Sequence, residues 1–490
     1  MPRFGFVGPS YASQSLNADA QACINWYPEA DESGAGNAPI MLYPTPGLKL
    51  FATLAGFPSR GSLTIGGRTF VVGGTTFCEV LADGAVTNWG SVANDGLPVT
   101  MAASPQQLLL ASAGTAYIFG LSANTLAAIP GVTFSGPVSQ AAICDDFFVL
   151  TIANSKTFYV SAPLDASDWT TNGSAIVSVF PDNIVSMIVD HREIWFASDT
   201  KTVVYYDSGA IFPFDVIPSA FIEAGIAAQA TLVQLDNTIF WLGADERGHG
   251  VVWRGYGYMP QRVSNHALEF AMQGYARIDN AVAFAYQDQG HQFYVLYFPT
   301  PSVTWVYDTL TQMWHQRGYW LEASGKFGAV HYWNHTFNFG RHLVGDWNSG
   351  KIYEMHIPVE TGAAWTFADD DGNPIRRVRR APHVSTEQKF QFFSELQVYV
   401  EAGLGPLPPL TDGAGNPRGP QMILRWSEDG GHNWSNEYAR DCGQAGQYAR
   451  RVRWLRLGNS RDRIFEVSCA DPVGFRIVDA YLQMTPGTGI

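Results

Sequence analysis

Three histidines lie within twelve residues and form the densest group of side chains that could bind a metal ion. On a strand, His331 and His335 would share one face, and His342 follows seven residues later. A metal site needs three or four converging ligands, and no acidic residue stands at strand spacing here. Packed or hydrogen-bonded histidines are therefore the favoured interpretation, and we predict no metal site.

Paired carboxylates at Asp145-Asp146 and Asp245-Glu246 are the next candidates for chemistry, and both pairs have the setting of turn residues beside strands. The sequence contains no G-x-S-x-G, no P-loop and no dinucleotide fingerprint. We predict that the protein is not an enzyme and uses no cofactor. The five cysteines are odd in number and far apart, which indicates buried thiols from a reducing compartment rather than disulfides. They are Cys23, Cys78, Cys144, Cys442 and Cys469.

A turn motif stands near the carboxyl end. Ser427, Asp429, Gly431 and Trp434 match the Asp-box pattern S-x-D-x-G-x-x-W. In this pattern the Asp carboxylate accepts backbone N–H groups in a hairpin turn, the Gly takes a positive φ and the Trp packs beneath. Sialidases carry several copies together with an arginine cluster and a tyrosine nucleophile, whereas here there is one copy. A structural turn is the favoured interpretation.

Charge divides the chain unequally. Residues 1–375 have a formal charge of −17, and residues 376–490 have +3. The change coincides with an acidic turn at 369–374 that is followed directly by a basic run. Such a run could meet phosphate, an acidic protein surface or solvent, and the acidic remainder disfavours a sequence-reading nucleic-acid binder. The candidate contacts with another subunit or a partner are Arg376, Arg377, Arg379 and Arg380.

One short pattern recurs seven times before the charge change and predicts the elements that position these residues. The pattern is a small or polar start followed by β-branched and aromatic residues, as in Thr76–Val80 and Thr202–Tyr206. Upstream of most copies lies another strand-like run, such as Glu193–Phe196, so the pairs indicate hairpins. The other copies are 115–119, 157–160, 251–254, 304–308 and 351–354.

A hairpin every 40–50 residues or so, with room for two more strands, is typical of four-stranded propeller blades. We predict an all-β chain: a β-propeller of about seven blades on residues 1–375, with six or eight allowed. An early strand at Arg3–Val7 is a candidate to complete the last blade. Long alternating strands after residue 376 predict an antiparallel β-sandwich on 376–490. A large β-sandwich or stacked β-domains are the alternatives to the propeller.

Length and composition agree with a two-domain globular protein. The chain has 490 residues, of which 13% are aromatic and only 15% charged. This composition excludes disorder and coiled coil. No apolar stretch approaches the roughly 20 residues that span a bilayer, and the amino terminus has no signal-peptide pattern, so we expect no membrane binding and no export by the usual route.

The two ends of the chain resemble a known family. Asn25-Trp26-Tyr27-Pro28, followed by Pro46-Gly47, resembles the start of the packaged-DNA stabilisation proteins of short-tailed phages, also called tail nozzle or tail accessory factors. The ending is similar too, with a strand, the Asp-box hairpin, an arginine-bearing strand at 451–457 and a last strand through Tyr481. The resemblance covers nearly the full chain, but none of its motifs is a catalytic signature.

The resemblance implies a structural virion protein made in the host cytoplasm and carried in the phage tail. It implies a homomeric ring, of six copies by similarity to the family, below the portal and its adaptor. The ring would close the channel, retain the packaged double-stranded DNA without reading its sequence, and release it at ejection. Other tail proteins, such as a fibre, tailspike or needle, would be further partners. A carbohydrate-binding or sialidase-like propeller and a cellular scaffold propeller are the competing functions.

Overall fold

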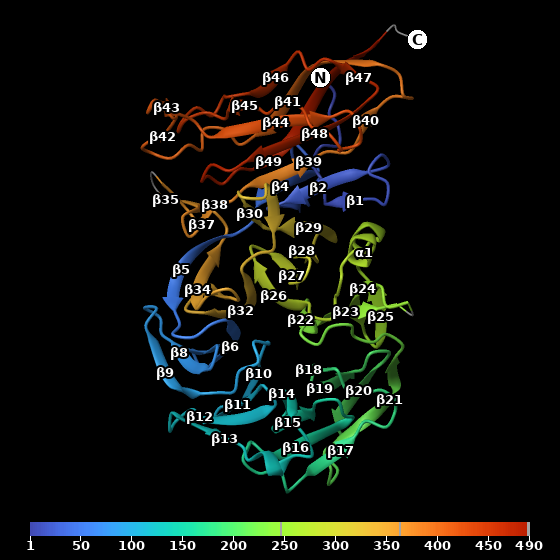
Figure 1. The fold of residues 1–490 in the computed structure, drawn as a ribbon, viewed down its shortest axis with the longest axis vertical. Helices are drawn as coiled ribbons and strands as arrows, with labels where there is room; N and C mark the ends of the chain where they lie inside the picture. The colour runs from blue at the N-terminus through green and yellow to red at the C-terminus, as the bar shows by residue number, and fades with distance from the viewer. Residues whose placement is uncertain (246, 362–363, 488–490) are drawn as a thin grey trace.

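Strands dominate the structure, a computed structural model that describes residues 1–245, 247–361 and 364–487. They form a ring of small sheets with a two-layered sandwich above it (Figure 1). Within the described residues there is one α-helix, α1 (His266–Gln273). Asn265 caps this helix, and its side-chain oxygen accepts the N–H of Leu268 at 2.9 Å.

The ring consists of seven four-stranded units, each an antiparallel meander. The first is β6 (Ser59–Ile65), β7 (Arg68–Gly73), β8 (Thr76–Val80) and β9 (Val86–Ser91). The second is β10 (Thr100–Ala103), β11 (Gln107–Ser112), β12 (Thr115–Gly120) and β13 (Thr125–Ala128). The third is β14 (Val138–Cys144), β15 (Phe147–Ile152), β16 (Thr157–Pro163) and β17 (Gly173–Ile176), after the short 3-10 helix at Gly131–Thr133.

The remaining blades continue in chain order. The fourth is β18 (Ser186–Asp190), β19 (Glu193–Ala197), β20 (Thr202–Asp207) and β21 (Phe214–Ile222). The fifth is β22 (Val233–Leu235), β23 (Thr238–Ala244), β24 (Gly250–Tyr256) and β25 (Met259–Arg262). The sixth is β26 (Val282–Asp288), β27 (His291–Phe298), β28 (Val303–Asp308) and β29 (Met313–Arg317). The seventh combines β32 (Tyr332–Asn338), β33 (Arg341–Asp346) and β34 (Lys351–His356) with β5 (Gly47–Thr53).

The predicted propeller of about seven blades is therefore confirmed, and each copy of the recurring pattern is the third strand of a blade. The runs upstream of them are second strands. Both are apolar because both their faces are covered by neighbouring blades: Phe70 and Val72 of the first blade pack in one cluster with Leu108 and Leu110 of the second. This two-sided burial explains why the third strands stand out in the sequence.

The ring closes through a strand other than the predicted one. Strand β5 pairs antiparallel with β34, from Gly47 opposite His356 to Thr53 opposite Lys351. The prediction that Arg3–Val7 completes the last blade is wrong, because Arg3 bridges Tyr481 instead and Phe6 is buried in the sandwich core. β5 succeeds because Leu48 is buried in the cluster of the sixth and seventh blades and Ala52 in that of the first and seventh, whereas Arg3 pairs with Asp479 of the sandwich.

The sandwich is built from both ends of the chain. One sheet has the order β3 (Trp26–Ala30), β4 (Ile40–Pro44), β49 (Ile477–Pro486), β41 (Gln391–Val400) and β46 (Val452–Leu455), with β47 (Asn459–Ser460) also on β41. The other has the order β2 (Ala20–Ile24), β39 (Arg377–Arg380), β48 (Asp462–Cys469), β44 (Gln421–Ser427) and β45 (Tyr438–Asp441). Strand β1 (Tyr11–Ala12) extends β2, and β40 (Val384–Ser385) pairs with β48.

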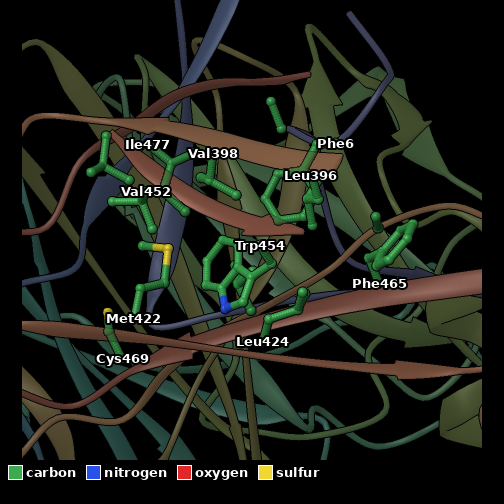
Figure 2. Packing of buried hydrophobic residues seen from close by; sticks show 14 of the residues in the cluster. Phe6, Leu396, Val398, Met422, Leu424, Val452, Trp454, Phe465, Cys469 and Ile477 are labelled. Atoms are coloured by element: carbon green, nitrogen blue, oxygen red, sulfur yellow. The ribbon is translucent and has the colours of Figure 1, made fainter. Parts of the chain in front are cut away.

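The two sheets enclose one apolar core. Trp454, Leu396 and Ile477 of the first sheet meet Met422 and Phe465 of the second, all of them at most 1% exposed (Figure 2). Alternation along β41 and β46 puts these side chains inward and polar ones outward. The antiparallel sandwich predicted for the carboxy-terminal part is thus confirmed.

Strand pairing puts part of the amino-terminal segment in a different unit from the predicted one. Strands β1 to β4, within residues 11–44, lie in the sandwich sheets, although the predicted propeller segment was 1–375. The propeller is inserted between two parts of the sandwich, and the two units share one sheet through the single parallel bridge of Ile24 with Gln316. Where the independently folding domains begin and end stays a prediction.

Four short hairpins complete the described structure. They are β30 (Tyr319–Leu321) with β31 (Lys326–Gly328), β35 (Val359–Thr361) with β36 (Ala364–Thr366), β37 (Asp369–Asp370) with β38 (Asn373–Pro374), and β42 (Leu410–Thr411) with β43 (Pro417–Arg418). All five cysteines are free and buried, as predicted. No helix among the described residues is long and apolar enough to cross a membrane.

Candidate functional site

Asn25 lies where the propeller and the sandwich meet. Its side-chain nitrogen donates to the carbonyl oxygens of Gly318, after the sixth blade, at 2.8 Å and of Arg376, before β39, at 2.7 Å. Its side-chain oxygen accepts the N–H of Gly318 at 2.9 Å. Asn25 has φ 58°, a left-handed conformation that Asn adopts more readily than most residues, and it is 3% exposed. One side chain therefore ties three distant segments together.

The residues after Asn25 point into two different cores. Trp26 is buried in the sandwich, and its indole N–H donates to the carbonyl of Phe475 at 3.0 Å. Tyr27 packs edge-on against Phe293 in the cluster between the last two blades. Pro28 follows Tyr27 in β3 and is also buried. This alternation makes β3 a shared wall between propeller and sandwich.

The Pro46-Gly47 turn leads from the sandwich into the closing strand β5. A Cβ atom on Gly47 would lie 2.3 Å from the carbonyl oxygen of Phe367 and 2.5 Å from that of Asp369. Real side chains do not approach backbone this closely, so only glycine fits here. Pro46 beside it is buried. The chain thus enters the propeller through a backbone crossing that excludes any side chain.

A buried histidine joins the two units a second time. His291 of β27 contacts Asp308 of β28 through Nδ1 at 2.9 Å and Glu29 of the sandwich strand β3 through Nε2 at 2.5 Å. Burial opposes protonation of His291, but the Asp308 and Glu29 carboxylates outweigh it and raise the pKa above its ordinary value. A protonated His291 donates to both carboxylates and holds Glu29 against the sixth blade.

The basic run 376–380 divides into buried and accessible arginines. Arg377 and Arg379 are 0% exposed because β39 is a central strand between β2 and β48. The prediction that these two contact another subunit is therefore wrong: their guanidinium groups are enclosed by this chain. Arg376 and Arg380 are half-buried, and for these two an external contact stays a prediction.

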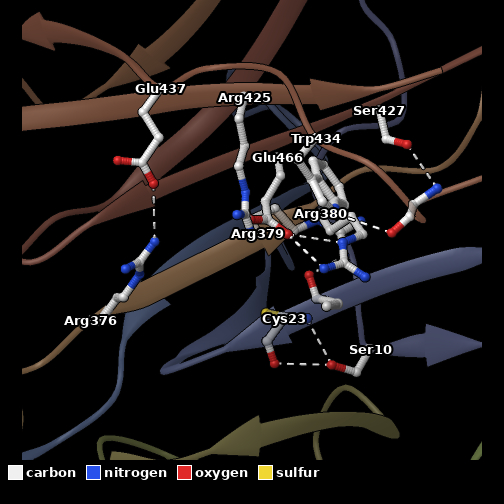
Figure 3. Close-up of polar contacts among 12 residues, drawn as sticks. Ser10, Cys23, Arg376, Arg379, Arg380, Arg425, Ser427, Trp434, Glu437 and Glu466 are labelled. Atoms are coloured by element: carbon white, nitrogen blue, oxygen red, sulfur yellow. Dashed lines mark hydrogen bonds and ion pairs between the residues drawn. The ribbon is translucent and has the colours of Figure 1, made fainter. Parts of the chain in front are cut away.

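Arg379 fastens the amino-terminal segment to the sandwich. It donates to the carbonyl of Phe6 at 2.6 Å, to that of Pro9 at 2.7 Å and to the side-chain oxygen of Gln21 at 2.7 Å. Ser10 and Cys23 bond to each other nearby (Figure 3). A buried cation therefore holds the first residues of the chain in place. The guanidinium group can bind several carbonyl oxygens at once, because it has five N–H donors in a rigid planar arrangement.

The Asp-box forms the loop between β44 and β45. Asp429 accepts the N–H of Asn433 at 2.8 Å and the hydroxyl of Ser427 at 2.7 Å, and Gly431 has φ 95°. The bonds from Asn433 and Ser427 lower the pKa of Asp429 to about 2. Trp434 packs against the guanidinium groups of Arg380 and Arg425, 4.7 Å from each.

Those two arginines share one buried acid. Glu466 receives Arg380 at 2.9 Å on one carboxylate oxygen and Arg425 at 2.6 Å on the other (Figure 3). The loop, the tryptophan and the three charges form one packed unit. This arrangement stabilises a turn and leaves the Asp429 carboxylate engaged by its own loop.

The three histidines of the sequence do not converge. His335 and His342 contact each other, with 3.0 Å between ring nitrogens. His331 lies beside Tyr319 instead, with the two ring centroids 4.7 Å apart. Burial, together with the His342 ring, lowers the pKa of His335 to about 3, so it stays neutral. Among the described residues no group of three or more His, Cys, Asp or Glu could hold a metal ion.

The described residues of the two carboxylate pairs lie in turns. Asp145 forms an ion pair with Arg192 of the neighbouring blade at 2.5 Å. Asp245 accepts the backbone N–H groups of Arg247 at 2.9 Å and His249 at 2.8 Å. Its sequence neighbour Glu246 lies outside the described residues.

The centre of the propeller contains a cavity of about 620 Å³. The first strand of every blade lines it, and the side chains include Met187, Gln140 and Trp333. No Asp or Glu lines the cavity in the described residues. The cavity is narrow and mostly uncharged.

Sequence reasoning missed the junction around Glu29 and His291. The signal at Glu29 was weak: a carboxylate in a strand flanked by aromatic residues. The sequence around His291 gave no sign of the junction, because its partners Glu29 and Asp308 are 262 and 17 residues away in the chain.

Solved structures with similar folds are distant. The extracellular domain of a hybrid two component system from B. thetaiotaomicron has 10% identity and a TM-score of 0.43; the alignment covers 81% of this chain and 47% of that one. The amino-terminal domain of Nup159 has 9% identity and a TM-score of 0.39, with 68% and 98% covered. BamB from Moraxella catarrhalis has 12% identity and a TM-score of 0.37, with 67% and 96% covered.

No curated protein matches this sequence. Two family models do match, and together they cover most of the chain. The β-propeller model of bacteriophage P22 Gp10 matches residues 8–359, and the β-sandwich model of the same protein matches residues 376–485. With its closed seven-bladed ring and its sandwich, the chain belongs to the bacteriophage P22 Gp10 family of phage structural proteins.

Proposed function

We propose that this protein forms the ring at the end of a phage tail channel that retains the packaged genome and lets it pass at ejection. Copies of the chain assemble into a ring, of six by resemblance to the family, and dock on the portal adaptor. Fibre, tailspike or needle proteins bind further along the tail. The protein works as a part of the virion and catalyses no reaction.

The observation that carries this proposal is the size of the propeller cavity. A base pair of duplex about 20 Å across and 3.4 Å high occupies on the order of 1,000 Å³. Strand β14, with seven residues, is about 23 Å long, so a duplex that threads the propeller would place about seven base pairs, several thousand Å³ or so, where the cavity has about 620 Å³. A duplex therefore cannot thread one propeller. A channel for DNA must therefore lie between copies, which requires a ring.

Charge supports the same arrangement. Residues 1–375 carry a formal charge of −17. A lumen lined by these residues would repel phosphates and keep the duplex mobile, because each Lys or Arg contact would add affinity through released counterions. Retention of the genome then depends on steric constriction by loops rather than on binding.

Microscopy and mass photometry of the purified protein, alone and mixed with the portal adaptor, test this proposal. We expect rings in at least one of the two samples, and a lumen whose surface is poor in Lys and Arg. Virions that lack the protein should package DNA and then expose it to added nuclease. A protein that stays monomeric with its adaptor would refute the assignment.

A further inference from the structure

A row of arginines marks one edge of the sandwich. Strands β45 and β46 are the last strands of their two sheets, so each has a backbone edge without a neighbour. They lie side by side: Trp454 donates to the carbonyl of Tyr438 at 2.7 Å, and Arg440 to that of Arg453 at 3.0 Å. Five exposed arginines lie on these two strands or next to them in sequence, and they are called here the arginine edge. They are Arg440, Arg450, Arg451, Arg453 and Arg456.

Most of this positive charge is unmatched. Residues 438–456 contain the five arginines and one acid, Asp441. Arg453 approaches Glu395 at 3.4 Å and Arg450 approaches Asp441 at 3.9 Å, while Arg451 and Arg456 have no ion pair in the described parts of the chain. Three large apolar side chains are exposed in the same stretch: Tyr438 at 41%, Tyr448 at 76% and Leu455 at 54%.

The third and fourth blades carry the opposite charge. Residues 138–222 hold ten Asp or Glu against three Lys or Arg, a formal charge of −7. Four carboxylates lie at the same end of these blades, in the turn after β14 and on either side of the loop between β20 and β21. They are called here the acidic blade surface and comprise Asp145, Asp146, Asp207 and Asp215.

Contacts between side chains support this grouping. Phe147 of the third blade and Phe214 of the fourth pack edge-on at 5.8 Å, so the two turns that carry the carboxylates lie next to each other. Only Asp145 has an ion pair among the residues that the structure describes, with Arg192. Ile211, in the same loop as Asp207 and Asp215, is 98% exposed. The surface thus combines unmatched negative charge with an apolar side chain.

We propose that the arginine edge of one copy docks on the acidic blade surface of the next copy. The two surfaces are complementary in charge, and each adds an apolar contact, Tyr448 and Leu455 on one side and Ile211 on the other. In Figure 1 the sandwich is at the top of the molecule and the third and fourth blades are at the bottom. The contact is therefore head to tail and joins two different surfaces.

Such a contact has a consequence for assembly. A heterologous interface repeats from copy to copy and closes into a ring when the rotation permits. This inference rests on the proposed ring and assigns the surfaces that build it. An alternative role for the arginines is to keep free sheet edges from pairing with other chains, which needs no partner.

Two charge-reversal variants test the assignment. The edge variant is Arg451→Glu with Arg456→Glu, and the blade variant is Asp146→Lys with Asp215→Lys. We expect each to weaken self-association by on the order of 100-fold at low salt, because like charges would face each other. A mixture of the two should assemble again into rings in which the variants alternate, because every contact then joins either the two native surfaces or the two reversed ones.

The combination and the control make the result specific. The protein with all four reversals should assemble again, because the charges are complementary once more. A matched control, Asp182→Lys with Asp199→Lys, changes the same charge at the other end of the fourth blade and should leave assembly unchanged. Melting temperatures within a few degrees of wild type would show that all variants fold.

Several outcomes would overturn the proposal. Rings formed equally well by both variants would refute these surfaces while leaving the proposed tail ring intact. Loss of binding to a 30-base-pair duplex in the edge variant, with unchanged assembly, would assign the arginine edge to DNA instead. A wild-type protein that never assembles, even with the adaptor, would refute the proposed function itself.

Discussion

Replacing Asn25 by Ala should be among the most destabilising single changes in this protein. The substitution removes three buried side-chain hydrogen bonds, two to the carbonyls of Gly318 and Arg376 and one from the N–H of Gly318. At about 1 to 1.5 kcal/mol each, their loss costs about 3 to 4.5 kcal/mol. The φ of 58° adds about 1 kcal/mol for a residue with a Cβ that cannot bond locally. We expect a total of about 4 to 5.5 kcal/mol.

Asn25→Gly separates the two contributions. Glycine loses the same hydrogen bonds but adopts a positive φ without strain, so this variant should be about 1 kcal/mol more stable than Asn25→Ala. Urea unfolding followed by tryptophan fluorescence and by circular dichroism measures both variants. Because two units share the junction, the first transition is the one to compare.

The same experiment can refute the reasoning. An Asn25→Ala protein within 1 kcal/mol of wild type would mean that the three segments are held together by other contacts. Equal stability of the Ala and Gly variants would mean that the left-handed backbone at this position carries no cost.

Four further predictions follow from the junction, the Asp-box and the loops. Gly47→Ala should prevent β5 from closing the ring, because a Cβ would lie 2.3 Å from a carbonyl oxygen; the yield of folded protein and protease resistance measure this, and a normal yield would contradict it. His291, with its raised pKa, stabilises the fold fully below its unfolded pKa of about 6.5 and loses this contribution as the pH rises through the folded pKa. Glu29→Gln should therefore show a flatter decline of the unfolding free energy as the pH rises above about 6.5; an unchanged slope would speak against the contact. Asp429→Ala should lower the melting temperature, and wild type should lose the Asp429 contribution as the pH falls from about 4 through the folded pKa of about 2. Limited proteolysis should cut first within 403–420, and cuts inside the blades instead would contradict the assigned loops.

The repeated elements could be predicted from sequence because each blade buries its central strands in the same way. Third strands such as Thr76–Val80 and Thr202–Tyr206 face a neighbouring blade on each side, so they keep their apolar residues while the outer strands vary. Strand β9, at the rim, has no fully buried residue and carries little signal. Blade number was therefore visible, whereas the outermost strand of the seventh blade was not.

The junction could not be predicted for a different reason. Asn25 pairs with segments 293 and 351 residues away, and no local pattern encodes such distances. The prediction that the basic run 376–380 lies at the surface was partly wrong for the same reason. Charged residues in a row usually indicate a solvated strand, but β39 is covered on both sides. Its Arg379 binds carbonyls of the amino-terminal segment. Long-range partners decide whether a charge is buried.

The insertion of the propeller between two parts of the sandwich sets an order of folding during synthesis. Strands β2 to β4 leave the ribosome first, but their sheet partners β39 and β49 begin more than 300 residues later. At about 5 to 20 residues per second, these early strands wait roughly 20 to 90 s with unpaired edges. The seven blades can form in the meantime, and β5 waits for β34 to close the ring. A chain that stops before residue 376 would therefore keep permanently exposed strands at its amino terminus, so that premature termination would produce aggregates rather than a shortened tail protein.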